Sequence, residues 1–319
     1  MKNTSMIDVV CVGLSVVNFP VFPADESIFT RDINPVSPIT LMPGGDAANQ
    51  AIILSRLGLK TALLTRRGRD AFGTMMLELL REYGADIDLS GVVTDGNKAT
   101  SVCAMMIRPD GQRHFCTHKG ALYDFCIGDI DLSILSRARV ASIGGMYGLP
   151  SFDGEGAAAF FRAAREQGVI TVADTKADIM GIGLKGIRKT LAYTDYFFPS
   201  YDEAAAISGQ TEPEGMARLF MDAGAKNVGI KLGAKGCYLR NADMEFYLPA
   251  IPADVVDTTG AGDNFMSGFI AGLLRGWDLR RCCLFGTAAA ALCISQVGPT
   301  TAVRSFEQVT EKLAQSGIL

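Results

Sequence analysis

Apolar runs of strand length alternate with stretches of helical spacing along most of the chain. The runs that predict buried strands lie at residues 6–13, 60–65, 139–144, 169–173, 195–198 and 227–232. Apolar residues spaced three and four positions apart predict helices at residues 46–58, 71–84, 153–168, 201–209 and 213–224. Continuous apolar strands separated by helices are typical of a parallel sheet covered on both faces. The pattern therefore predicts an α/β fold with a mostly parallel central sheet.

Two stretches break this alternation and predict a small second sheet. Residues 99–118 contain two strand-like runs joined by Pro109-Asp110-Gly111, which is a strong hairpin turn. Residues 14–43 are rich in Pro, Val and Phe and lack helical periodicity, so they are candidates for further strands. We expect residues 14–43 and 98–120 to form a β lid inserted into an α/β body. The residues assigned to that body are 1–13, 44–97 and 121–319.

Composition narrows the classes of function. Of the 319 residues, 48% are apolar and 20% are charged, which is enough apolar sequence for a large core. A net charge of −4 without a Lys or Arg run argues against nucleic acid and anionic membranes as partners. Asp8 interrupts the first apolar run, and residues 283–294 are too short to cross a bilayer. We therefore expect a cytoplasmic protein.

Two residue types constrain the chemistry. The eight cysteines are scattered without a CxxC pair, which predicts reduced core residues. The only histidines are His114 and His118, so a His-rich metal site is excluded. An Asp or Glu is therefore favoured as a general base.

A glycine-rich turn, DTTGAGDNF at residues 257–265, precedes an apolar helical pattern that ends at Gly276. The first amides of a helix attract anions, and glycines let the backbone approach a ligand. No GxxxxGK[ST] string occurs, and a dinucleotide fingerprint would need glycine where Phe265 stands. Local sequence leaves two interpretations of Asp263, a helix cap or a general base for phosphoryl transfer to an alcohol.

Two separated motifs carry a resemblance to a known family. They are GGDAANQAIILSRLG at residues 44–58 and DTTGAGDNFMSGFIAGLLRG at residues 257–276. Through them the chain resembles the PfkB family, the ribokinase-like carbohydrate kinases, over essentially its whole length. The resemblance implies a three-layer α/β/α sandwich with a β lid over the sugar. It also implies phosphorylation of a hydroxymethyl group with ATP and Mg²⁺.

The resemblance assigns roles to residues of both motifs. Asp263 is implied as the catalytic base. The backbone of the anion hole is implied to come from Gly260, Ala261 and Gly262. The residues implied to contact the sugar are Gly44, Gly45, Asp46 and Asn49. Asp46 and Asn49 are one helical turn apart, so both can face one cleft, with capping and surface solvation as the alternative.

A further segment resembles the family's nucleotide-phosphate stretch. It is KLGAKG at residues 231–236, and the residues implied near ATP are Lys231, Gly233 and Gly236. An ordinary hairpin with a glycine turn is the alternative interpretation. Residues 289–298 resemble the wall of the adenine pocket.

The resemblance also implies cation sites. SYDE at residues 200–203 matches the family's Asn-x-x-Glu magnesium motif at Glu203, where Mg²⁺ would be held through water, but Ser200 replaces the asparagine. Asp257 and Thr259 match residues that hold a monovalent cation such as K⁺ in related enzymes. Whether this chain binds one is left open.

The sugar end of the site departs from the family pattern. Asn18 stands where many members carry a sugar-binding aspartate, and an amide can donate as well as accept. Asp174 and Lys176 follow a predicted strand, at the edge where open α/β sheets bind ligands. One interpretation is that Lys176 contacts an acidic or phosphorylated sugar. The alternative is that it is a solvated loop lysine. Four side chains on or near the lid hairpin are candidates to face the substrate: Arg108, Arg113, His118 and Lys119. The alternative is that they face solvent or a second subunit.

We therefore expect an ATP-dependent sugar kinase that forms a homodimer through its lid. A nucleoside kinase on the same fold is kept open by Phe19 and Phe22, and a phosphosugar kinase would need a basic clamp such as Lys176. A catalytically weak sugar-binding regulator is the alternative from another class, and the retained Asp263 argues against it. The sugar and the phosphorylated carbon are left open.

Overall fold

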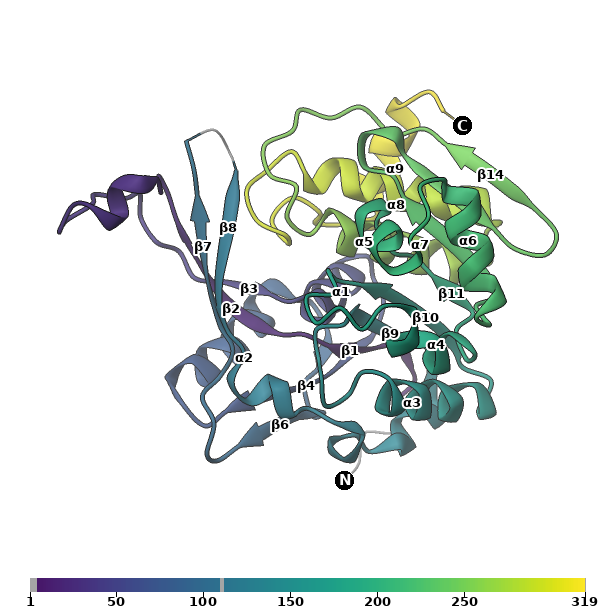
Figure 1. Cartoon of the computed structure of the whole chain (residues 1–319), viewed down its shortest axis with the longest axis horizontal. Coiled ribbons are helices and arrows are strands. Elements are labelled where there is room, and N and C mark those ends of the chain that lie inside the picture. The colour runs from purple at the N-terminus through teal and green to yellow at the C-terminus, as the bar shows by residue number, and fades with distance from the viewer. Residues whose placement is uncertain (1–4, 110–111, 319) are drawn as a thin grey trace.

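The computed structural model describes residues 5–109 and 112–318, and its larger part is a sheet between two layers of helices (Figure 1). The strands of this sheet, in spatial order, are β14 (Glu245–Leu248), β13 (Cys237–Arg240), β12 (Asn227–Lys231), β11 (Tyr196–Phe197), β10 (Ile170–Thr175), β9 (Ala138–Met146), β1 (Ile7–Gly13), β4 (Thr61–Gly68) and β5 (Ile87–Asp88). A further strand, β6 (Val92–Asp95), also pairs with β4. Among the described pairings of this central sheet, only those of β13 with β12 and β14 are antiparallel. The predicted fold class is confirmed.

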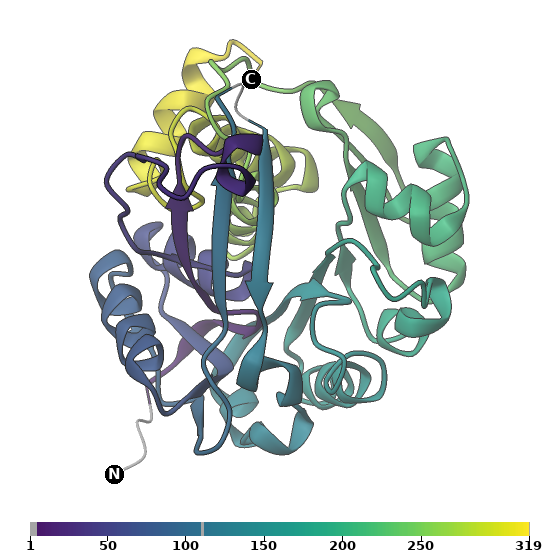
Figure 2. The ribbon, with the colours of Figure 1, turned by 60° about the vertical axis from the view of Figure 1, so that its left-hand side comes forward.

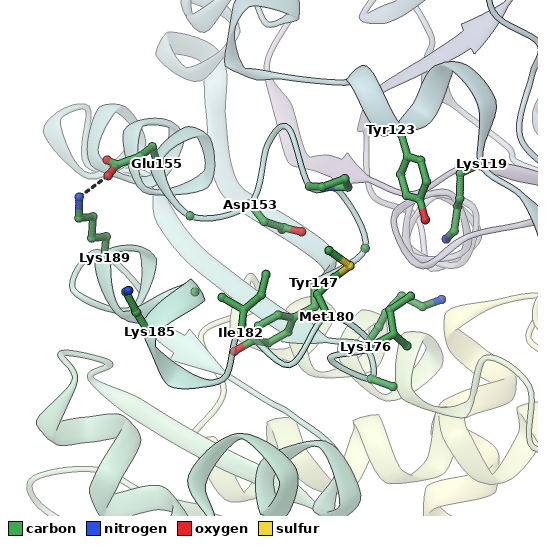
Figure 3. Close-up of a pocket in the computed structure, with 16 residues that line it drawn as sticks. Lys119, Tyr123, Tyr147, Asp153, Glu155, Lys176, Met180, Ile182, Lys185 and Lys189 are labelled. Carbon is green, nitrogen blue, oxygen red and sulfur yellow. Dashed lines mark hydrogen bonds and ion pairs between the residues drawn. The ribbon is translucent and has the colours of Figure 1, made fainter.

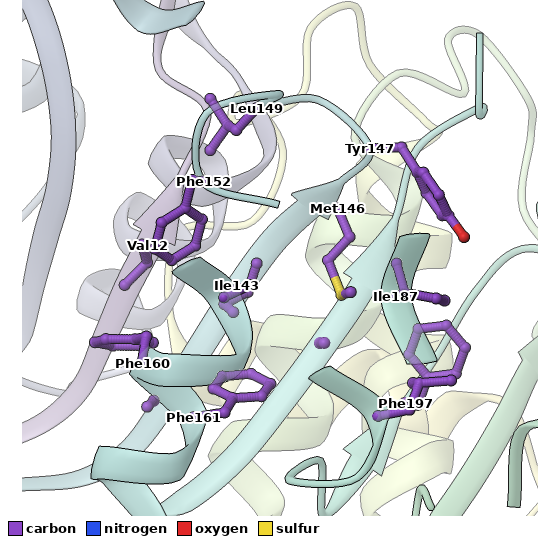
Figure 4. Close-up of a cluster of buried hydrophobic side chains, with 14 of the residues drawn as sticks. Val12, Ile143, Met146, Tyr147, Leu149, Phe152, Phe160, Phe161, Ile187 and Phe197 are labelled. Carbon is purple, nitrogen blue, oxygen red and sulfur yellow. The ribbon is translucent and has the colours of Figure 1, made fainter. Parts of the chain in front are cut away.

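Each face of the sheet has its own helices and its own apolar core. The helices on one face are α3 (Glu155–Glu166), α4 (Leu184–Leu191), α5 (Tyr201–Ser208) and α6 (Pro213–Asp222). Those on the other are α1 (Asp46–Arg56), α2 (Ala71–Tyr83), α7 (Ala261–Leu273), α8 (Leu279–Cys293) and α9 (Phe306–Gln315). Successive residues of β1 enter opposite cores, with Cys11 in the second and Val12 in the first, among Phe160 and Phe161 of α3 (Figure 4). Strands buried on both faces explain the continuous apolar runs.

A second, small sheet stands beside the central one (Figures 1 and 2). Its strands, in spatial order, are β3 (Met42–Gly44), β2 (Val16–Val21), β7 (Val102–Ile107) and β8 (Arg113–His118). The predicted hairpin is formed by β7 and β8, whose turn residues Asp110 and Gly111 lie outside the described residues. The small second sheet is confirmed, and its assignment to a separate lid at residues 14–43 and 98–120 stays a prediction.

Short 3₁₀ helices fill the connections that sequence periodicity left unassigned. They are η1 (Glu26–Phe29), η2 (Gly120–Asp124), η3 (Ile127–Asp129), η4 (Leu132–Arg137) and η5 (Gly233–Lys235). Each of the eight cysteines is a free thiol, as expected, but Cys116 is exposed and Cys126 is half-buried rather than in the core. Across residues 5–109 and 112–318, none of the helices has the length and apolar character needed to span a membrane.

Glycines allow α7 and α8 to pack with their backbones in contact. A Cβ atom on Gly268 would lie 2.8 Å from the Cα of Gly286, and one on Gly286 would lie 2.7 Å from the carbonyl oxygen of Phe265. Both distances are shorter than van der Waals contact, so neither position has room for a side chain. Because α7 begins in the glycine turn, this packing fixes where that turn lies.

We predict that Gly268→Ala destabilises the protein, because the added methyl group must push α8 away from α7. Overpacking of this kind costs about 1–3 kcal/mol. Urea denaturation followed by circular dichroism measures the loss. Gly96→Ala is the matched control, since no atom lies within 4 Å of a Cβ placed there. Equal stability of the two variants would contradict the prediction.

Candidate active site

Residues from both predicted motifs line one cavity of about 740 Å³ at the carboxyl-terminal edge of the central sheet. Residues of the predicted site found in its lining are Asp46, Asp174, Lys176, Ser200, Glu203, Lys231, Gly233, Gly236, Gly260, Ala261, Gly262 and Asp263. An apolar part of the wall comes from residues 250–253 and from Ala290, Ala291 and Ile294 of the segment expected at the adenine. Segments far apart in sequence therefore meet at this cavity.

The glycine turn forms the amino-terminal end of α7. Gly260 caps the helix in the left-handed conformation, with φ of 75°. A Cβ on Gly260 would lie 2.4 Å from Pro299 Cβ, and one on Gly262 would lie 3.0 Å from Lys231 Nζ. The amides of the first helical turn have no intrahelical acceptor, and the helix dipole makes this end positive. The turn and Lys231 together form a positively polarised part of the cavity wall.

Asp263 is a buried carboxyl group on the third residue of α7. Its Oδ2 accepts a hydrogen bond from Asn49 Nδ2 at 2.7 Å, and α7 has no side-chain cap. The helix-cap interpretation is therefore wrong. Burial raises the pKa of Asp263 well above its usual range, and the carboxylates of Asp46 and Asp174 raise it further. Its carboxylate is consequently a stronger base than that of an ordinary aspartate.

Asp46 and Asn49 lie on the first turn of α1, and both face Asp263 or its cavity. Asp46 Oδ2 is 3.6 Å from Lys176 Nζ. This carboxylate raises the pKa of Lys176, which stabilises the charged ammonium. Gly145 is packed against the same oxygen, because a Cβ there would lie 2.0 Å from Asp46 Oδ2. Sequence reasoning missed Gly145, although two glycines at the end of a predicted strand signal a close approach.

The other predicted sugar contacts lie beside the cavity rather than in its lining. Asn18 is buried on β2, and a Cβ on Gly44 would lie 2.0 Å from its Nδ2. Gly45 caps α1 with φ of 91°, and a Cβ there would lie 2.5 Å from the carbonyl oxygen of Leu14. These glycines let β3, α1 and the end of β1 converge.

Asp174 has one hydrogen bond and one ion pair, on different carboxylate oxygens. Its Oδ1 accepts from the Gly145 amide at 2.8 Å, and its Oδ2 is 3.6 Å from Lys231 Nζ. Burial raises the pKa of Asp174 to about 6, with Lys231 acting against the rise and Asp46 adding to it. Lys231 therefore lies between an acidic residue and the glycine turn.

Ser200 and Glu203 form a capping box at the start of α5. Glu203 Oε2 accepts from the Ser200 amide at 2.8 Å and from Thr175 Oγ1 at 2.9 Å, while Ser200 Oγ accepts from the Glu203 amide. Both residues line the cavity. No cluster of three or more His, Cys, Asp or Glu side chains suited to a metal occurs in the part of the chain that the structure describes. Any divalent ion here would therefore depend on water and on a ligand for most of its coordination.

Asp257 holds an arginine from the second sheet. Arg113 of β8 pairs with Asp257 Oδ1 and donates to Thr258 Oγ1 at 2.6 Å. The Asp257 carboxylate also accepts from the amides of Thr259 at 2.7 Å and Gly298 at 2.8 Å. The sequence placed Arg113 in the hairpin but gave no sign of this partner.

The chain matches the model described as pfkB family carbohydrate kinase over residues 6–305. The chain belongs to this family. It is 25% identical over 290 residues to fructokinase-2 of Zea mays, covering 86% of each chain. It is 28% identical over 300 residues to 5-dehydro-2-deoxygluconokinase of Geobacillus kaustophilus, covering 89% of this chain and 88% of that one.

Structural comparison agrees with the sequence match. The Arabidopsis thaliana ribokinase complexed with ribose and ATP superposes with a TM-score of 0.82 at 26% identity. The match covers 97% of this chain and 99% of the ribokinase. The ribokinase-like fold expected from the two motifs is thereby confirmed, and the protein is a carbohydrate kinase.

The burial of Asp263 predicts an unusual effect on stability. A carboxyl group whose pKa is raised by folding makes the folded state less stable as pH increases from the unfolded value of about 4 through the folded value. We expect Asp263→Asn to raise the melting temperature at pH 8 and to change it little near pH 4. Differential scanning calorimetry at both pH values measures the effect.

Asp95 provides the opposite case as a control. Backbone amides of Asn97 and Lys98 and the Arg66 guanidinium lower the pKa of Asp95 to about 2. A lowered pKa stabilises the fold above the unfolded value, and this contribution is lost as pH falls towards 2. Asp95→Asn should therefore lower the melting temperature at pH 8. If Asp263→Asn lowered the melting temperature at pH 8, as Asp95→Asn should, the assigned pKa of Asp263 would be wrong.

Proposed function

We propose that this kinase transfers the γ-phosphoryl group of ATP to a hydroxyl of a sugar or sugar derivative, with Asp263 as the general base. The observation that carries the proposal is the buried Asp263 carboxyl group, with its raised pKa, directly beside the amides of the glycine turn. A carboxylate near the acceptor hydroxyl and positive dipoles at the phosphoryl group are what this transfer requires.

Three elements are proposed to hold ATP. The amides of Gly260, Ala261 and Gly262 face the developing charge on the phosphoryl group, and Lys231 lies beside them. Gly233 and Gly236 shape the cavity wall near the phosphates, and Ala290, Ala291 and Ile294 provide an apolar surface for the base. The ribokinase with 26% identity was solved with ATP and ribose, which supports this assignment.

Glu203 is proposed to hold Mg²⁺ through water. Its Oε2 is occupied by Ser200 and Thr175, and the carboxylate still lines the cavity, which fits an ion bound largely by water and phosphate oxygens. When bound, Mg²⁺ neutralises charge on the phosphates. Ser200 acts here by capping α5 and orienting Glu203 rather than as a metal ligand.

The sugar is proposed to lie between α1 and the end of β10. Asp46, Asp174 and Lys176 line the cavity next to Asp263, and Asn49 orients the Asp263 carboxylate through its hydrogen bond. Asn18, Gly44 and Gly45 support this end from the second sheet and the start of α1. The relatives are named for neutral sugars and for a sugar acid, so their names do not decide the substrate.

The second sheet is proposed as a lid that also pairs two subunits. Side chains along β8 from His114 to His118 are exposed, and Phe115 presents 54% of its surface to solvent. A strand with exposed side chains, an aromatic one among them, suits a partner surface. Sedimentation velocity of the wild type and of Phe115→Asp would test the homodimer.

A screen for ADP release tests the function. We expect ADP release from ATP to depend on one of a panel of aldoses, ketoses, sugar acids, phosphosugars and nucleosides. Asp263→Asn should lower kcat by roughly 10²–10⁴-fold, the usual contribution of a general base, while ATP affinity changes little. Asp243→Asn, on the surface, is the matched control. Wild-type turnover in Asp263→Asn would refute the assigned base.

A further inference from the structure

Figure 3 shows the residues that line a second cavity, of about 720 Å³. The two cavities share Lys176 and Ala177, so they meet next to Asp46 and the proposed acceptor position. Its walls come from η2, the loop after β9, the loop after β10 and α4. A ligand that begins at Asp263 and extends past Lys176 would enter this second cavity.

Positive charge exceeds negative charge in the lining. The lysines are Lys119, Lys176, Lys185 and Lys189, and the acidic residues are Asp153 and Glu155. Glu155 is already paired with Lys189 at the far end of the cavity, as the dashed line in Figure 3 shows. Within the described part of the chain, neither Lys119 nor Lys185 forms an ion pair.

Lys119 and Lys176 form the basic end that adjoins the first cavity. They lie on the same side in Figure 3 but come from different elements, Lys119 from the residue before η2 and Lys176 from the residue after β10. Burial lowers the pKa of Lys119, and the neighbouring Lys176 ammonium lowers it further. Asp46, whose Oδ2 is 3.6 Å from Lys176 Nζ, offsets part of this positive charge, and a second anion would offset the rest.

Asp153 does not supply that anion. Its Oδ2 accepts from the Leu149 amide at 2.8 Å, and its buried Oδ1 has no hydrogen-bond partner in the described structure. Burial raises the pKa of Asp153 to about 7. Near neutral pH this group readily takes up a proton and can then donate a hydrogen bond to an anionic oxygen.

We propose that this second cavity binds an anionic group, a carboxylate or a phosphate, of the acceptor sugar, with Lys119 and Lys176 as its main contacts. The inference rests on the proposed function, because it takes the acceptor hydroxyl to lie at Asp263. It narrows the substrate class to sugar acids and phosphorylated sugars. The anionic group lies at the end of the substrate remote from the hydroxyl that receives the phosphoryl group.

Direct binding tests the anion site independently of turnover. Isothermal titration calorimetry without ATP compares fructose, gluconate and fructose 6-phosphate. We expect at least one anionic probe to bind more tightly than fructose. Lys119→Gln should weaken that binding by roughly 10–100-fold, the equivalent of one lost charged hydrogen bond. Lys119→Arg, which keeps the charge, should retain most of the affinity.

Controls separate this inference from the proposed function. Lys60→Gln removes an exposed lysine away from both cavities and should bind like the wild type. In ADP-release assays, Lys119→Gln should raise KM for the anionic acceptor and leave kcat nearly unchanged. If fructose bound as tightly as both anionic probes, or if Lys119→Gln weakened all three equally, the anion site would be refuted. The proposed kinase function would fail separately, through unaltered turnover in Asp263→Asn.

A second observation concerns the monovalent cation site that the sequence left open at Asp257 and Thr259. Arg113 contributes a guanidinium there, held by Asp257 and Thr258, and the Asp257 carboxylate also accepts two backbone amides. Arg113 and Asp257 are both largely buried, with 16% and 5% of their side-chain surfaces exposed. The carboxylate that a monovalent ion would need is therefore already engaged by donors of this chain.

We infer that the Arg113 guanidinium takes the place of a monovalent cation beside the glycine turn, so that the kinase does not depend on K⁺. An arginine is charged at any pH of interest and can hold two acceptors at fixed geometry. Because Arg113 belongs to β8, the positive charge comes from the second sheet, and binding of a free ion is not needed.

Potassium rescue tests this inference. Melting temperature and turnover of the wild type should be the same in KCl and in tetramethylammonium chloride at equal ionic strength. Arg113→Gln should lower turnover by roughly tenfold or more, as expected for a lost electrostatic contact near the reaction centre, and KCl should restore part of both quantities. Arg113→Lys should need no KCl. A wild type that requires K⁺, or an Arg113→Gln variant with wild-type turnover in tetramethylammonium chloride, would refute it.

Discussion

Three carboxyl groups lie close together at one edge of the central sheet, with those of Asp174 and Asp263 buried and that of Asp46 half-buried. Mutual repulsion and loss of solvent make this arrangement costly, and the ion pairs with Lys176 and Lys231 offset part of that cost. Hydrogen bonds stabilise these carboxylates further. The Asn49 side-chain amide donates to Asp263, and the Gly145 backbone amide donates to Asp174. The Asp263 carboxylate keeps its raised pKa, and with it its strength as a base, because the surrounding core holds these charged groups together.

The same constraint explains where glycine is needed. Gly145 leaves room for the Asp46 carboxylate, and Gly260 lets the chain turn into α7 against Pro299. The close packing of α7 on α8 then fixes the position of the glycine turn relative to α1. Arg113 lies on β8 of the second sheet, and Lys119 directly follows that strand. The second sheet therefore brings positive charge towards the carboxyl groups of the α/β body.

Much of the fold could be predicted from the sequence because the central strands are buried on both faces, and the apolar runs record that burial directly. The capping box of Ser200 and Glu203 and the glycine turn are likewise local signals. The hydrogen bond between Asn49 and Asp263 joins residues 214 positions apart, and the pair of Arg113 and Asp257 spans 144 positions. Such contacts follow from tertiary packing, so periodicity and motif spacing could not reveal them. The 3₁₀ segments between residues 120 and 137 were not predicted from the sequence for the same reason, since neighbouring elements set their ends.

The short connection between β1 and β2 has a mechanical consequence. Only Leu14 and Ser15 separate a strand of the central sheet from a strand of the second sheet, and the Leu14 carbonyl accepts a hydrogen bond from the Ala48 amide of α1 at 3.1 Å. This connection is therefore bonded to the helical turn that carries Asp46 and Asn49. A rotation of the second sheet would therefore displace the first turn of α1. It would also move Arg113, which lies on β8 of the same sheet. One joint thus couples the position of the hairpin to the alignment of the groups around Asp263.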